Sequence, residues 1–207
     1  MSILQLRIEL ADVAPLIWRR LQIPDTYSFW DLHVAIQSAF GWNDSHLHEF
    51  AVPGKGGNAA LLHFGIPLPD DGFQRSEDRP LAGWEHRVST HLALGLTGVT
   101  YLYDFGDHWE HSVVLEQILE SSPGRRYPRC VAGERAGPPD DCGGPHGYAS
   151  LLEVLADPKA ENHAEMRAWT SSIKGLRGAF DPEAFDEQQI KFANPMPRLR
   201  RMLREIG

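Results

Sequence analysis

The amino-acid sequence predicts an α+β protein, with an antiparallel or mixed sheet in the N-terminal two-thirds, helices packed on that sheet, and a mainly helical C-terminal part. Two observations favour this class. Several early segments alternate apolar and polar residues at a period of two, as half-buried strands do, whereas later segments space their apolar residues three and four apart, as helices do. Strands therefore come first and helices last, unlike the regular alternation of a parallel α/β sheet.

The first elements are a pair of strands and a helix. Residues 3–10 and 16–23 both carry alternating apolar residues, and we expect them to pair antiparallel. The segment Ser28-Phe-Trp-Asp31 is typical of a helix start in which a hydroxyl and a carboxylate satisfy free backbone amides. Apolar residues then recur on one face until Gly41, a residue type that often ends helices. We therefore predict a helix over residues 29–40.

The middle of the chain is predicted to return to the sheet. Further strands are expected at 46–52, 98–104 and 109–119, with a short helical or irregular piece at 88–96. Gly106 stands between the last two strands, where a tight turn or a bulge is expected. The stretches 53–80 and 121–147 are rich in Gly, Pro and Asp, which predicts long loops with little regular structure.

The final third is predicted to be helical. The expected helices are 148–155, 163–169, one that opens at Asp181-Pro182, and 196–206. In the last of these, Met196, Leu199, Leu203 and Ile206 form an apolar stripe surrounded by arginines. We expect one domain over residues 1–207, with its core in about 3–192 and a basic C-terminal helix in 193–207.

Composition and charge restrict the function classes. The formal charge of −8 and the pI near 5.6 argue against a general affinity for nucleic acid, which clustered cations drive. The C-terminal arginines are the exception, and a nucleic-acid contact is expected only through Arg198, Arg200, Arg201 and Arg204. A solvated helix face is the alternative interpretation of this cluster. No apolar run approaches the ~20 residues of a membrane helix, and two cysteines fit a reducing cytoplasm, so we expect a cytoplasmic protein without a membrane partner.

The run Tyr101-Leu-Tyr-Asp-Phe-Gly-Asp-His-Trp-Glu-His111 concentrates chemically active side chains between two predicted strands. The carboxylates of Asp104 and Asp107 flank a glycine and could converge on a cation or on ligand hydroxyl groups. Tyr103 and Trp109 would offer aromatic faces, and His111 would share the strand face of Trp109. The alternative is a structural hairpin, in which the aspartates accept backbone amide hydrogen bonds and the aromatics pack in the core.

His46 and His48 form a His-x-His pair whose side chains would leave the same face of a strand. Metal-binding pairs have this spacing, and a carboxylate or His111 on a neighbouring strand would complete a three-ligand site for a divalent metal. In the alternative interpretation, one histidine is packed in the core and the other bonds a carboxylate.

The 138–148 loop holds a second group of candidates. Asp140 and Asp141 precede two glycines and would form an acidic loop near the binding face. The glycine pair lacks the lysine and the strand-to-helix setting of a phosphate loop. Cys130, Cys142 and His146 are spaced more widely than most zinc ligands, so two unpaired thiols are the simpler interpretation.

Four motifs together resemble one known family. They are Ile17-Trp-Arg-Arg20 with Phe29-x-x-Leu-His33, Gly41-Trp-x-x-Ser-His-Leu-His-x-Phe50, the Tyr-Asp-Phe-Gly-Asp-x-Trp-x-His run, and Pro138-Pro-Asp-Asp-Cys-Gly-Gly-x-x-Gly-Tyr148. In this order they are similar to the plasmid pRiA4b ORF-3-like family. The resemblance implies relatives in bacteria, archaea and mobile elements, some with a resolvase-like label. The chain departs from the pattern at Gly137, where many relatives have a further cysteine.

Three functional hypotheses follow. The first is a non-enzymatic binding or interaction module whose face contains His46, His48, the 103–111 hairpin and the 138–148 loop. The second is a metal-dependent hydrolase that uses the same histidines and aspartates. The third is an accessory protein of mobile DNA that contacts nucleic acid through its C-terminal arginines. The sequence contains no Gly-x-Ser-x-Gly elbow and no recombinase-like layout of a serine with an arginine cluster.

Overall fold

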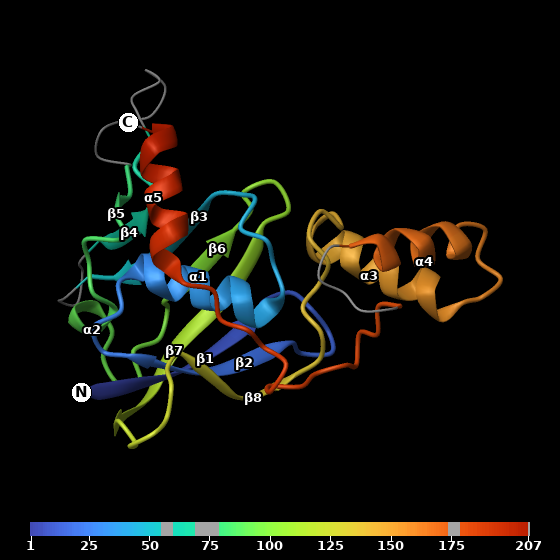
Figure 1. Ribbon diagram of the computed structural model, residues 1–207. Coiled ribbons are helices and arrows are strands. Elements are labelled where there is room, and N and C mark those ends of the chain that lie inside the picture. The colour runs from blue at the N-terminus through green and yellow to red at the C-terminus, as the bar shows by residue number, and fades with distance from the viewer. Residues whose placement is uncertain (55–59, 69–78, 174–178, 207) are drawn as a thin grey trace.

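The computed structural model describes residues 1–54, 60–68, 79–173 and 179–206. In these residues an eight-stranded sheet has the order β5-β4-β3-β6-β7-β1-β2-β8 (Figure 1). Its strands are β1 (Ser2–Leu10), β2 (Trp18–Pro24), β3 (His48–Pro53), β4 (Leu61–Gly65), β5 (Leu81–Ala82), β6 (Thr100–Tyr103), β7 (Trp109–Glu120) and β8 (Arg129–Glu134). All neighbouring strands pair antiparallel except β4 and β5, so the predicted α+β class with a mixed sheet is confirmed.

The centre of the sheet is formed by β1, β2 and β7. In β1 every second side chain is buried, and Leu6 pairs with Leu21 of β2 on one side and with Leu115 of β7 on the other. This alternation is the physical basis of the register, because a slip by one residue would turn the apolar side chains toward solvent. The predicted antiparallel pair at the N-terminus is confirmed.

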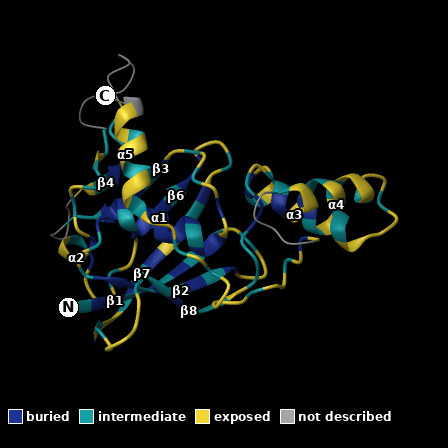
Figure 2. Cartoon of the chain, in the orientation of Figure 1, coloured by how far each residue is buried: buried dark blue, intermediate teal, exposed yellow. Residues whose placement is uncertain are grey.

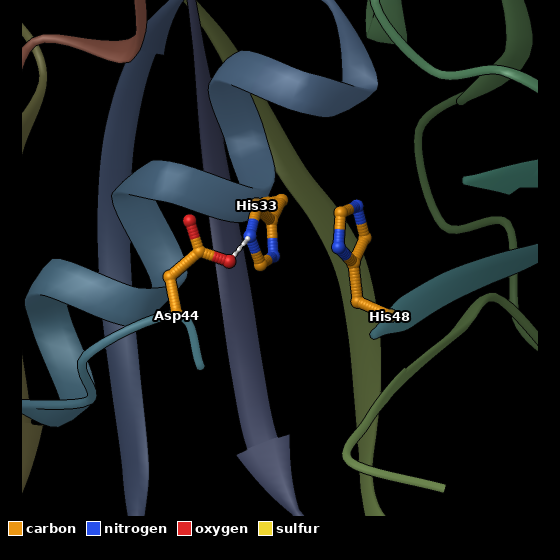
Figure 3. Close-up of side chains that lie close together, drawn as sticks. All are labelled: His33, Asp44 and His48. Carbon is orange, nitrogen blue, oxygen red and sulfur yellow. Dashed lines mark hydrogen bonds and ion pairs between the residues drawn. The ribbon is translucent and has the colours of Figure 1, made fainter. Parts of the chain in front are cut away.

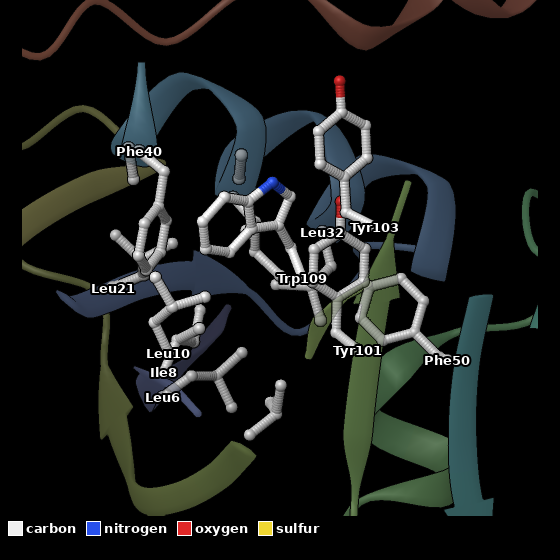
Figure 4. Packing of buried hydrophobic residues seen from close by; sticks show 14 of the residues in the cluster. Leu6, Ile8, Leu10, Leu21, Leu32, Phe40, Phe50, Tyr101, Tyr103 and Trp109 are labelled. Carbon is white, nitrogen blue, oxygen red and sulfur yellow. The ribbon is translucent and has the colours of Figure 1, made fainter. Parts of the chain in front are cut away.

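Helix α1 (Phe29–Phe40) packs on the sheet and supplies the other half of the core. The Ser28 side chain accepts a hydrogen bond from the Asp31 amide, and the Asp31 carboxylate accepts one from the Ser28 amide, which is the capping box expected from the sequence. Gly41 ends the helix with φ +83°, a left-handed conformation that suits glycine. Figure 4 shows Leu32 and Phe40 of α1 packed with Tyr101 and Trp109 from the sheet.

The remaining helices are α2 (Val88–His91), α3 (Gly144–Ala156), α4 (His163–Ser172) and α5 (Pro195–Ile206). In Figure 1, α3 and α4 form a helical pair beside the sheet, and α5 stands near α1. Tyr148 and Leu151 join α3 to the core, and the Trp30 indole donates to the Pro195 carbonyl at 3.1 Å. Much of the outward surface of α4 and α5 is exposed (Figure 2). In the described part of the chain, no helix is long and apolar enough to cross a membrane.

Three predictions about individual elements were wrong. Strand β4 lies inside the stretch predicted to be irregular, of which 55–59 and 69–78 fall outside the described residues. Strand β8 lies in the second predicted loop, and its edge position leaves only Cys130 buried, so it lacks a strand's apolar alternation. The helix predicted to open at Asp181-Pro182 does not form, because this segment packs against β8 and the Pro182 carbonyl accepts a hydrogen bond from the Ala136 amide.

Candidate functional site

Three loops meet at one end of the sheet and bring three of the candidate residues together. The His46 Nε2 atom lies 3.0 Å from Asp141 Oδ1 and 3.4 Å from Asp104 Oδ2. His46 precedes β3, Asp104 opens the turn between β6 and β7, and Asp141 belongs to the loop before α3. We call His46, Asp104 and Asp141 the His46 junction. All three ligand atoms lie within 4.8 Å of one another, as a shared cation would require.

The turn between β6 and β7 uses only one oxygen of Asp104. Its Oδ1 atom accepts hydrogen bonds from the amides of Gly106 at 2.9 Å and Asp107 at 3.3 Å. Its Oδ2 atom is the one that faces His46. The positive φ angles of the turn occur at Asp104 and His108, not at Gly106. Asp104 therefore serves the hairpin and the junction at the same time, and the two interpretations of this residue do not exclude each other.

The loop that carries Asp141 is anchored on both sides by other carboxylates. Asp140 Oδ2 accepts hydrogen bonds from the backbone amide and the side-chain amide of Asn43, at 3.0 and 3.1 Å. Asp107 Oδ2 accepts one from the Gly143 amide at 3.1 Å. These two aspartates thus do not point at His46, but they hold Asp141 in place beside it.

The junction is open to solvent and its surroundings are acidic. The side chain of Asp141 is 71% exposed and that of His46 is 31% exposed, while Asp104 is largely covered at 12%. Burial raises the pKa of the nearby Asp140 carboxyl, and the Asp141 charge raises it further. Burial raises the pKa of the Cys142 thiol to about 12, and Asp107, Asp140 and Asp141 all contribute to this. Several carboxylates thus lie close to one another at this end of the sheet, and their combined negative charge favours a bound cation.

The remaining candidates of the 103–111 run lie in the core. Trp109 is 1% exposed and His111 is fully buried, so neither presents a face to a ligand, contrary to the stacking role expected for Trp109 (Figure 4). His111 Nδ1 lies 3.1 Å from the Trp109 carbonyl, and burial lowers the pKa of this imidazole to about 3. The Tyr103 ring is also buried, and its hydroxyl accepts a hydrogen bond from the Ser45 amide. Of this run, Asp104 belongs to the junction, and the Tyr103 ring packs edge-on against His46, with ring centroids 5.8 Å apart.

His48 does not lie beside His46 in the junction. Strand β3 begins at His48, and His46 belongs to the loop before it. It points into the core and stacks on His33 of α1, with ring centroids 3.5 Å apart and planes inclined by 6° (Figure 3). His33 Nε2 lies 2.7 Å from Asp44 Oδ1, and its Nδ1 lies 2.8 Å from the Tyr101 hydroxyl. His46 and His48 therefore belong to different clusters, and no group of potential metal ligands in the described part of the chain contains both.

The protons in this buried network can be assigned from its partners. A carboxylate only accepts, so His33 Nε2 carries the proton and donates to Asp44. The Nδ1 atom then accepts from the Tyr101 hydroxyl, whose oxygen accepts from Gln37 Nε2 at 3.0 Å. Burial lowers the pKa of His33, which agrees with a neutral imidazole.

His33, Asp44 and His48 offer ligand atoms within 4.8 Å, but their geometry does not suit a metal. A metal lies in the plane of each imidazole that binds it, and two parallel planes 3.5 Å apart share no point. Both nitrogens of His33 also have partners already. The sequence pattern did not predict this cluster. Its one signal is a pair of polar residues, His33 and Gln37, which stand four apart on a helix whose other residues are mostly apolar.

Arg198 connects the C-terminal helix to the same region. Its guanidinium lies 3.3 Å from Asp44 Oδ2 and donates to the Asn43 carbonyl at 2.8 Å. Of the arginines expected to contact nucleic acid, this one is therefore engaged within the protein. Arg200, Arg201 and Arg204 are exposed.

The two cysteines are free thiols and lie apart. Cys130 in β8 approaches the Ala132 carbonyl, and neither cysteine belongs to a group of potential metal ligands within the described ranges. A Cβ atom on Gly137 would overlap the Phe40 carbonyl. The close approach of these two backbones therefore requires a glycine at position 137.

Comparison with known proteins agrees with the motifs. The sequence profile of the plasmid pRiA4b ORF-3-like protein family matches residues 2–189. The chain belongs to the plasmid pRiA4b ORF-3-like family. A similar member is the uncharacterized protein y4hQ of Sinorhizobium fredii (strain NBRC 101917 / NGR234), which is 38% identical over 174 residues, covering 83% of this chain and 82% of the relative.

A solved structure shows that the pRiA4b ORF-3-like fold described above is shared. The crystal structure of MM3350 from Methanosarcina mazei Go1, a protein of unknown function, superposes with a TM-score of 0.80 at 36% identity. The match covers 92% of this chain and 98% of that one. Neither relative's name states an activity.

Proposed function

We propose that this pRiA4b ORF-3-like protein is a binding module that recognises its ligand at the His46 junction and holds a divalent cation there. The single observation that carries the proposal is the convergence of His46 Nε2, Asp104 Oδ2 and Asp141 Oδ1 from three separate loops. An imidazole nitrogen with carboxylate oxygens is a ligand set that zinc and other first-row divalent metals accept.

The spacing of the ligand atoms supports this. Around a metal with bonds of ~2.1 Å, neighbouring ligand atoms are about 3.0 Å apart in octahedral and about 3.4 Å apart in tetrahedral geometry. The two separations from His46 Nε2, 3.0 Å to Asp141 Oδ1 and 3.4 Å to Asp104 Oδ2, lie in this range. The hydrogen bonds that Asp107 accepts from the Gly143 amide and Asp140 from the Asn43 amide fix the loop that carries Asp141.

Metal-dependent hydrolysis is the second candidate, and the number of ligands favours it. Three protein ligands leave coordination positions free for water, which is the pattern of catalytic rather than structural metal sites. The exposure of Asp141 keeps that side accessible. Release of nitrophenol from nitrophenyl phosphate or acetate esters by the metal-loaded protein, lost in His46→Ala, would favour hydrolysis over binding alone.

Contact with nucleic acid depends on the exposed Arg200, Arg201 and Arg204 of α5. Binding to duplex DNA that weakens with salt and disappears in the triple alanine variant would support it. Absence of DNA binding even at low salt would refute the nucleic-acid hypothesis. The net charge of −8 and the inward position of Arg198 make this the third choice.

The main proposal is tested by calorimetric titration of tag-free protein with Zn²⁺ and Mn²⁺. We expect about one equivalent to bind, and His46→Ala to weaken binding by at least ~10-fold, since even outer-shell changes cost that much. His108→Ala is the matched control, because His108 is an exposed histidine on the adjoining turn and lies outside the junction. No binding by the wild type, or equal binding by His46→Ala, would refute the proposal.

A further inference from the structure

A cleft of about 310 Å³ lies between α3 and α4, next to the His46 junction. Its walls are mainly apolar, with Leu151 and Val154 from α3 and Met166 and Trp169 from α4, and the polar Ser150 and Asn162 also line it. Asp141 and Cys142 stand at one end. We call this space the α3–α4 cleft. Its volume is at the lower limit of small-molecule sites, which suits a compact ligand.

The walls retain apolar surface that the fold does not cover. Leu151 is buried in the core, but Val154, Met166 and Trp169 are only half-buried, and they face one another across the two helices. An indole, a flexible thioether and a branched aliphatic side chain together form a surface that packs well against an aromatic or aliphatic group. The helical pair thus offers a place for the apolar body of a ligand.

In the described part of the chain, the only formal charge on the walls of the α3–α4 cleft is negative. Among the described residues that line it, Asp141 is the only one with a formal charge, and its carboxylate is 71% exposed. Asp107 and Asp140 lie close enough to act on the Cys142 thiol in the same wall. A carboxylic acid or phosphate would be repelled here, whereas a cation would be attracted.

We propose that the α3–α4 cleft binds a small organic cation, an ammonium on an aromatic or aliphatic body, with the body between Met166 and Trp169 and the ammonium at Asp141. The inference goes beyond the metal site, since it concerns different walls and shares only Asp141 with the junction. Metal and amine would therefore compete for the same carboxylate.

A matched ligand series tests the charge requirement. The probes are phenethylamine, its neutral analogue 2-phenylethanol and the anion 3-phenylpropanoate, each titrated into metal-free protein and followed by calorimetry and by NMR shifts. We expect the amine to bind at least ~10-fold more tightly than the alcohol, a free-energy difference of about 1.4 kcal/mol, and the anion not to bind. Equal binding of amine and alcohol, or no binding of the amine, would overturn the proposal.

Variants locate the site. Asp141→Asn should reduce the preference for amine over alcohol, and its asparagine tolerates the left-handed backbone of this position at φ +60°. Trp169→Ala should lose the amine and keep the metal, while His46→Ala should lose the metal and keep the amine. If Trp169→Ala fails to fold, Met166→Ala is used with a smaller expected loss. Amine binding that His46→Ala abolishes and that Trp169→Ala or Met166→Ala leaves unchanged would place the amine at the junction and refute the cleft.

Discussion

His33 and His48 stack face to face in the core, with ring centroids 3.5 Å apart and planes within 6° of parallel. This contact joins α1 to β3 immediately beside the loop that carries His46. Burial lowers the pKa of both imidazoles, and that of His48 is lowered further by the neighbouring His33. The stack therefore requires neutral rings. Protonation of either ring at low pH would weaken the contact between α1 and β3 beside the His46 junction.

Acidification should destabilise the fold before the carboxylates titrate. The unfolded chain binds protons at His33, His48 and His111 below pH ~6.5, whereas the folded chain does not, down to pH about 3 for His111. Stability present above pH ~6.5 is thus lost as the pH falls, at roughly 1.4 kcal/mol per pH unit for His111, and the lowered pKa values of His33 and His48 add to this loss. Urea denaturation between pH 7.5 and 5 measures the slope. His48→Phe should flatten it, and a free energy of unfolding that does not change over this range would contradict the assignment.

Asp44→Asn should destabilise the protein by ~2 kcal/mol, because one side-chain oxygen then has to satisfy both His33 and Arg198. The backbone of Asp44 at φ +56° suits asparagine, so the effect reports the lost charge and not strain. Arg198→Ala is the comparison, with a smaller cost because its guanidinium is partly exposed. Thermal or chemical denaturation measures both. An Asp44→Asn variant as stable as the wild type would show that the network does not hold α1 and α5 together.

Gly137→Ala should cost at least ~2 kcal/mol, since the new methyl group would overlap the Phe40 carbonyl and force the two backbones apart. Gly106→Ala is the matched control, because its Cβ would meet only the Asp104 carboxylate at 3.3 Å. We expect the control to change the free energy of unfolding by less than ~1 kcal/mol. Similar costs for the two variants, measured by urea denaturation, would refute the close-approach explanation of this glycine.

Trp109→Phe should lower stability by ~1–3 kcal/mol and leave metal binding at the His46 junction unchanged. The indole is buried against the Trp42 and Tyr148 rings and does not touch the junction. Denaturation and metal titration of the same preparation separate the two effects. A variant of normal stability with weakened metal binding would instead place Trp109 in the recognition surface.

Local sequence patterns correctly predicted the strands and helices that have one apolar, buried face and one polar, exposed face. The alternation in 3–10 and the capping signals around 29–40 led to the observed β1 and α1, because burial and capping leave direct marks on the sequence. Strand β8 has no such mark, since its pairing with β2 depends on backbone hydrogen bonds at a sheet edge. The segment after Asp181 carries a helix signal, which its contacts with β8 override.

In the candidate site, too, local sequence patterns predicted some residues, whereas others depend on tertiary contacts. The composition of the 103–111 run marked Asp104 as important, but its alternation could not show which side chains face inward at the start of β7. Asp141 meets His46 only because Asp140 and Asp107 anchor a loop that has no periodicity of its own. Contacts of this kind join residues nearly a hundred positions apart, and no local pattern encodes them.

The central claim, that His46, Asp104 and Asp141 form a cation site, is tested most directly by anomalous diffraction from crystals soaked in Mn²⁺ or Zn²⁺. We predict one anomalous peak at ~2.0–2.2 Å from His46 Nε2, Asp104 Oδ2 and Asp141 Oδ1, absent from Asp141→Asn crystals treated in the same way. A well-ordered junction without a peak, or a peak only at other histidines, would contradict the account.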